Sequence, residues 1–170
     1  MNESIINQLK AALDETVQLL SSFEPDEINK VPFEGSWTAA QAAQHLFLSQ
    51  KDMDKLLLTQ TLEVNRPADA NAENLKSIFL NFDQKFKSPD FIDPEDKIYD
   101  KSELIKSLQD VESKLVKATQ EANLSQEAPL PPGHPLQGNS KLEIIYFTTY
   151  HAMRHNRQIT NIKNSLDSRS

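Results

Sequence analysis

The sequence predicts an all-α protein that folds as a four-helix bundle. Only three of the 170 residues are glycine, and the abundant Leu, Ala, Lys, Gln, Glu and Asp are residues of helices or surfaces rather than strands. Four long segments repeat apolar residues at three- and four-residue steps, which is the period of one helix face. The length suits one domain with a buried core. We expect residues 1–166 to form that domain and residues 167–170 to be a flexible tail.

The first two predicted helices span residues 3–23 and 38–62. The first carries an apolar stripe of Ile6, Leu9, Leu13, Val17 and Leu20. The start of the second is marked by Thr38 and Gln41, which fit a capping box, in which each residue's side chain binds the other's backbone N–H. Trp37 stands where a hydrophobic staple would pack back onto the helix; a role as a pocket wall is the alternative.

The third and fourth predicted helices span residues 101–123 and 140–166. In the third, the apolar positions step by four and three residues, which is the seam of a bundle: Leu104, Leu108, Val111, Leu115, Ala118 and Ala122. The fourth begins at a second capping box, formed by Ser140 and Glu143. These patterns complete the four helices of the bundle.

A connection of about forty residues separates the second and third helices. Within it, Ile78, Phe79, Phe82 and Phe86 lie at helical spacing, so we expect a short extra helix against the bundle. Plain core packing and a lid over a pocket both explain its aromatic residues. The length of the connection allows the second and third helices to run parallel.

Composition and charge exclude several functions. The net charge is −7 and the pI is near 5.1, which argues against general binding of nucleic acid, because phosphates require a basic face. The absence of cysteine removes disulfides, thiolate nucleophiles and Cys-ligated metals. We see neither a signal peptide nor a run of 18 apolar residues, so we expect a cytoplasmic protein without membrane contact.

Three of the four histidines fall on inward-facing stripes. Successive helical residues turn by about 100°, so His151 and His155 share one face of the fourth helix. That face is apolar at both ends and reads Ile144, Thr148, His151, His155, Gln158 and Ile162. His45 lies on or beside the corresponding inward stripe of the second helix.

Buried imidazoles are costly unless they are hydrogen-bonded or bound to a metal. Satisfied core histidines therefore explain the pair on the fourth helix nearly as well as a metal does, and the third histidine favours the metal. "HAMRH" lacks the Glu of a metalloprotease helix. The chain also contains no Glu-x-x-His pair, which a carboxylate-bridged di-iron bundle requires. Three neutral ligands would leave an ion with its full double charge and an open position, where a water or thiol is acidified.

Three segments together resemble the DinB/YfiT-like superfamily. "SWTAAQAAQHL" (36–46) resembles the start of its second helix, "GHPLQGNSKLE" (133–143) the loop before its fourth, and "HAMRHNRQI" (151–159) its last motif. The resemblance covers most of the chain and implies a four-helix bundle with a three-histidine metal site at His45, His151 and His155. The ion implied is nickel, zinc, iron or manganese.

The resemblance also implies a range of functions. The expected activity is that of a thiol-dependent S-transferase, which joins a low-molecular-weight thiol to a small electrophilic substrate. A metal-dependent hydrolase and a non-catalytic metal-binding stress or scaffold protein are the alternatives. Dimers are common in the family, so we expect a homodimer.

Five further residues surround this pattern. Gln158 and Gln41 are candidates to support the ligands by hydrogen bonds. Asp52, two turns beyond His45 on the second helix, is a weaker candidate for direct support. For Arg154 we expect an ion pair between helices rather than a substrate contact. His134 lies on a loop rich in Pro and Gly, where we expect it to fix the entry to the fourth helix; a proton carrier that approaches the site is the alternative, and we do not expect His134 to bind metal.

Overall fold

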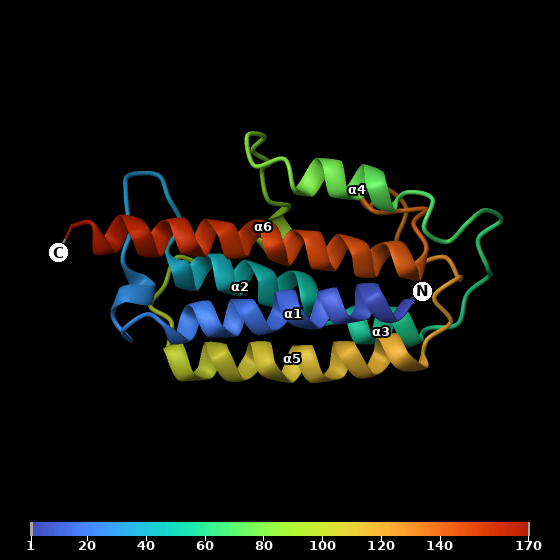
Figure 1. The fold of residues 1–170 in the computed structure, drawn as a ribbon, viewed down its shortest axis with the longest axis horizontal. Helices are drawn as coiled ribbons and strands as arrows, with labels where there is room; N and C mark the ends of the chain where they lie inside the picture. Colours follow the sequence, from blue (N-terminus) through green and yellow to red (C-terminus); the bar gives the residue numbers. More distant parts are fainter. Residues whose placement is uncertain (1, 170) are drawn as a thin grey trace.

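The computed structural model describes residues 2–169. Its long helices lie side by side along one axis (Figure 1), which confirms the predicted all-α bundle. They are α1 (Asn2–Ser21), α2 (Ala39–Gln50) with its continuation α3 (Met53–Leu58), α5 (Lys101–Glu121) and α6 (Lys141–Asp167). A shorter helix, α4 (Ala72–Phe79), packs on α6 at the outside of the bundle, and the 3-10 turns η1 (Glu27–Asn29) and η2 (Asp90–Ile92) lie in the connections.

The long connection between α2 and α5 is a crossover. Helices α1 and α6 run in one direction and α2 and α5 in the other, so the second and third long helices are parallel (Figure 1). The start of α5 lies beside the end of α1, where Lys101 Nζ donates to the carbonyls of Ser21 and Phe23 at 3.1 and 2.6 Å. The chain therefore returns the full length of the bundle through residues 59–100 before it begins α5.

Apolar stripes from all four long helices form the core. The cluster nearer the α3 end of the bundle includes Leu9, Leu13, Leu46, Leu115 and Ile145. The cluster at the other end includes Leu20, Ala42, Leu108, Ile159 and Ile162. Because α2 contributes mostly alanines to this second cluster, its backbone approaches the neighbouring helices closely, which brings its polar side chains near those of α6.

The helix starts follow the predicted caps. Thr38 and Gln41 form the reciprocal capping box of α2, and Ser140 and Glu143 form that of α6. Each satisfies two backbone N–H groups that a helix start would leave without a partner, and such a cap stabilises a helix by about 1 kcal/mol.

The predicted helix over residues 38–62 is wrong in its second half. It breaks at Lys51 and Asp52, restarts as α3 and ends at Leu58. Residues 60–64 are extended because they pair with the chain just after α5: Glu127 N–H donates to Leu62 O at 2.9 Å and Val64 N–H to Ser125 O at 3.0 Å. This pairing gives one isolated bridge, between Glu63 and Gln126, and residues 2–169 contain no strand.

The short extra helix exists but lies earlier than predicted. It ends at Phe79, so Phe82 and Phe86 follow it in a segment without helical structure. Phe79 is half-buried against a core cluster, whereas Phe82 and Phe86 remain 41% and 46% exposed. Core packing therefore explains the first of these aromatic residues and not the other two.

A buried ion pair joins the crossover to α6. The Glu143 carboxylate is fully buried and accepts from both Nη atoms of Arg66, at 2.7 and 2.8 Å, and from the N–H groups of Asn71 and Ser140, each at 2.8 Å. Burial acts to raise the pKa of Glu143, but these hydrogen bonds outweigh it and hold the pKa below its ordinary value. The start of α6, and with it the register of this helix, is thereby fixed.

The described ends of the chain belong to the bundle helices α1 and α6. Helix α6 runs to Asp167, one residue into the predicted tail, and Ser170 lies outside the described residues. The division into a domain and a tail stays a prediction. None of the helices in residues 2–169 is both long enough and apolar enough to cross a membrane.

Candidate metal centre

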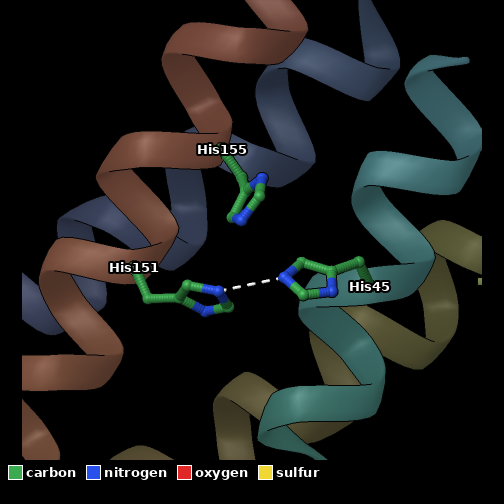
Figure 2. Close-up of side chains that lie close together, drawn as sticks. All are labelled: His45, His151 and His155. Carbon is green, nitrogen blue, oxygen red and sulfur yellow. Dashed lines mark hydrogen bonds between the residues drawn. The ribbon is translucent and has the colours of Figure 1, made fainter. Parts of the chain in front are cut away.

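Three imidazoles meet between α2 and α6. His45 reaches across from α2, while His151 and His155 project from successive turns of α6 (Figure 2). Each ring offers one nitrogen to a common centre, and these nitrogens lie within 4.8 Å of one another. His45 and His151 are 3% and 6% exposed and His155 is half-buried. The structure therefore brings together the three histidines predicted from the sequence.

The outer nitrogen of each ring faces an acceptor. His45 Nδ1 lies 2.9 Å from the carbonyl oxygen of Ile92, and His155 Nδ1 lies 2.7 Å from Oε1 of Gln158. A carbonyl oxygen only accepts, so both rings carry their proton on Nδ1. His151 Nδ1 lies 3.4 Å from Ser49 Oγ, whose hydroxyl donates to Leu46 O and leaves its lone pairs free to accept. These contacts leave the Nε2 atoms available at the centre.

The Nε2 atoms of His45 and His151 are 3.0 Å apart (Figure 2). Two nitrogen lone pairs would repel at this distance, so a proton or a metal cation must lie between them. The weak contact of His151 with Ser49 allows a proton on His151 Nε2 to fill that role, and a cation could replace it. Nitrogens bound to one zinc at about 2.0–2.1 Å are themselves about 3–4 Å apart. The His45–His151 pair meets this range at its lower end, and the three nitrogens together lie within 4.8 Å. The residues therefore fit a divalent metal.

Burial keeps these imidazoles neutral. It lowers the pKa of His45, although the Ile92 carbonyl and the Asp93 carboxylate partly oppose the shift. It lowers the pKa of His151 well below the ordinary value and that of His155 to about 3, with neighbouring imidazoles and the Arg154 guanidinium adding to the effect. Because a metal binds only the neutral imidazole, the centre is ready for an ion at neutral pH.

Aromatic rings surround the three histidines. The Trp37 ring lies 5.2 Å from that of His45 and stacks on that of His155 at 6.3 Å between centroids. The Phe147 ring stacks on that of His151 at 5.0 Å between centroids. Trp37 also packs against the core cluster that contains Ala42, so it serves both the helix start and the wall of the site. These rings limit the access of water, which strengthens electrostatic interactions inside the site.

The other candidate residues divide into those at the site and those away from it. Gln158 holds His155, as expected. The side-chain oxygen of Gln41 accepts from Thr38 N–H at 3.0 Å, so it serves the helix cap. Asp52 is exposed and pairs with Lys55 at 3.3 Å. The Nδ1 of His134 accepts from Leu136 N–H at 3.0 Å within its own loop, and the ring is outside the histidine group.

The expected ion pair of Arg154 is absent among the described residues. Its guanidinium instead donates to the carbonyls of Phe79 at 3.3 Å, Asn81 at 2.9 Å and Gln84.

Sequence reasoning also missed the two groups that hold His45 and His151, the Ile92 carbonyl and the Ser49 hydroxyl. Ser49 lies one turn after His45, a spacing that could have indicated it. A backbone carbonyl carries no sequence signal.

The fold and the centre together define a helical bundle that presents three convergent histidines to one point. The sequence profile of the DinB superfamily matches residues 8–159, and the chain belongs to this superfamily. The matched segment contains all three histidines. No match is found among the curated proteins or among the solved structures.

Proposed function

We propose that His45, His151 and His155 hold one divalent transition metal and that the protein is a metal-dependent enzyme. The observation that carries the proposal is the pairing of each Nδ1 with an acceptor, which leaves the Nε2 atoms to converge. Such contacts fix the tautomer and orientation of metal-binding imidazoles. The Nε2 atoms of His45 and His151 lie 3.0 Å apart, so a proton held between them is the alternative to a metal at this point.

The charges around the centre favour an anionic ligand. Among the described residues, the ligand group contains only histidines and no carboxylate. The Arg154 guanidinium adds positive charge near the two histidines of α6, whose pKa values it lowers. A divalent ion held by three neutral ligands keeps its full charge and acidifies a bound thiol or water. Asp93 acts on His45 from outside the ligand group, but no carboxylate joins the three described ligands, so a thiolate suits the site.

The reaction we propose is the transfer of a small electrophile to a low-molecular-weight thiol. The thiol loses its proton to solvent, its sulfur attacks the electrophilic carbon, and a leaving group such as halide departs with the bonding electrons. Trp37 and His155 are half-buried, and we propose that the reactants approach from their side. The wall of aromatic rings excludes water, which would compete with the thiol.

Hydrolysis is less well supported. A hydrolase usually needs a general base beside the attacking water, and the histidines of the group are used as ligands while no carboxylate joins them. A scaffold without turnover would have no need of an open side. Among nickel, zinc, iron and manganese, three imidazoles suit the first three, whereas manganese prefers oxygen ligands.

The test is a two-stage screen of the purified protein. The protein is stripped and reloaded with each of the four metals, and thiols are then offered with a chromogenic aryl halide and, separately, with an activated ester. Metal-dependent loss of the aryl halide that requires the thiol supports the transferase. Thiol-independent hydrolysis of the ester would replace it with a hydrolase, and tight metal binding without either reaction would leave a metal-binding scaffold.

A further inference from the structure

The segment between α4 and the end of η2 has few apolar contacts of its own. This segment, residues 80–92, is called the strap below. Residues 81–87 are all exposed, and the hydrogen bonds within this stretch come from Asp83 and Gln84 to Asn81. Segments with so little buried surface are held in place only when other elements attach them. The position of the strap therefore depends on what binds it from outside.

Arg154 supplies that attachment from α6. Its guanidinium donates to three carbonyls, that of Phe79 just before the strap and those of Asn81 and Gln84 within it, and it lies 4.8 Å from the centre of the Phe86 ring. A planar guanidinium presents several donors in a fixed arrangement, so it can fix a loop through several carbonyls at once. A lysine has one small donor group and cannot reproduce this set.

The far end of the strap contacts His45. The Ile92 carbonyl accepts from His45 Nδ1 at 2.9 Å, and the Ser88 hydroxyl lies 3.3 Å from the same nitrogen. The strap thus contacts Arg154, which lies between His151 and His155 in the sequence of α6, at one end and His45 of α2 at the other. The strap therefore links α6 to His45, in addition to the direct contact of His151 with His45 at 3.0 Å.

We propose that Arg154 is a positioning residue for His45: by holding the strap, it keeps the Ile92 carbonyl where it fixes the Nδ1–H tautomer of His45 and turns Nε2 to the centre. This role deepens the proposed function and rests on it, because positioning matters only if His45 is a ligand. The competing explanation is that the burial of Ile92, which is 9% exposed, fixes the carbonyl without help from Arg154.

The experiment compares Arg154→Met and Arg154→Lys with Arg157→Met. Arg157 is the matched control, because it also lies on α6 and its guanidinium stands over the ring of the strap residue Phe82, 4.5 Å from the ring centre. The histidine tautomers of the metal-free, ¹⁵N-labelled proteins are read by NMR at pH 8 from couplings between ring nitrogens and carbon-bound protons. Zn²⁺ affinity is measured by competition with a chelator, and far-UV circular dichroism checks the helices.

We expect His45 to be a single Nδ1–H tautomer in the wild type and in Arg157→Met, and a mixture in both Arg154 variants. His155 should stay Nδ1–H throughout, because Gln158 holds it from its own helix. Zn²⁺ affinity should fall about 10-fold in both Arg154 variants, as expected for the loss of support to a ligand. An unchanged His45 tautomer in Arg154→Met would overturn the inference, as would wild-type behaviour of Arg154→Lys, since charge alone would then suffice.

The proposed function fails separately. If the wild type binds no divalent metal, the metal centre is refuted, while the tautomer of His45 in the metal-free proteins still decides whether Arg154 positions that ring.

Discussion

Replacing Glu143 by glutamine should destabilise the protein strongly, although it changes one oxygen to an NH₂ group. The carboxylate has four donors around it, from Arg66 and from two backbone N–H groups. Whichever oxygen is replaced, the new NH₂ group faces a backbone N–H and one Arg66 nitrogen. A buried donor without an acceptor costs about 1–3 kcal/mol.

The loss of the ion pair adds to this cost. Removing one partner from a fully buried pair costs about 3–5 kcal/mol, but the Arg66 side chain is 33% exposed and water can solvate much of its charge. We therefore assign about 1 kcal/mol to the lost charge, as for a half-exposed pair. The sum is about 2–4 kcal/mol in the free energy of unfolding, or about 4–16 °C in Tm for a chain of this length.

The assay is urea unfolding followed by circular dichroism at 222 nm, with Glu103→Gln as the control. Glu103 occupies the same third position in α5, where its N–H binds the Asp100 cap, but its side chain is exposed. We expect that control to change stability by less than about 0.5 kcal/mol. Equal and small effects in both variants would refute the idea that the buried carboxylate fixes the start of α6.

Four further predictions concern the centre and the core. Gln158→Leu should weaken metal binding about 10-fold or more without loss of helicity, because His155 loses the acceptor at its Nδ1; chelator competition measures this. The metal-free protein should lose stability as the pH falls from about 6.5 toward the pKa of about 3 that His155 has in the folded state, because the unfolded chain binds the proton first. The loss should be about 1.4 kcal/mol per pH unit for each imidazole that stays neutral in the folded state. Urea unfolding across pH 4–8 checks it, and a flat profile would contradict it. Gln50→Met should leave stability unchanged or raise it by about 1 kcal/mol, because the buried Nε2 of Gln50 has no hydrogen-bond partner within residues 2–169; a clear loss in urea unfolding would count against this. The homodimer expected from the family stays a prediction, which light scattering would decide.

The parts of the molecule that follow from local patterns were predictable. The inward stripe of α6 places His151 and His155 because a helix of regular period fixes which residues share a face. The caps of α2 and α6 were predictable because their hydrogen bonds join residues three apart in the sequence. Gln41 shows the limit of such reasoning, since one residue fitted both a cap and a ligand support, and only the structure shows its oxygen in the cap.

What sequence reasoning missed depends on contacts between distant segments. No proline or glycine marks the break at Asp52, after which the helix resumes at Met53. The chain leaves the helix only after Leu58, where residues 60–64 pair with the residues after α5. The strap has the apolar spacing of a helix, but Arg154 binds its carbonyls in another conformation. The contact of His45 with Ile92 uses a backbone oxygen and therefore does not depend on the side chain at that position.

The most direct test of the metal centre is the zinc stoichiometry and affinity of the wild type beside His45→Ala, His151→Ala, His155→Ala and His134→Ala. All five proteins are stripped and loaded in the same way, and their helicity and Tm are compared. We predict one ion per chain in the wild type and in His134→Ala, and affinity lower by orders of magnitude in the other three, which should stay helical because the apolar seams hold the bundle. Full metal content in each of those three variants would contradict the account and leave the histidines as core residues.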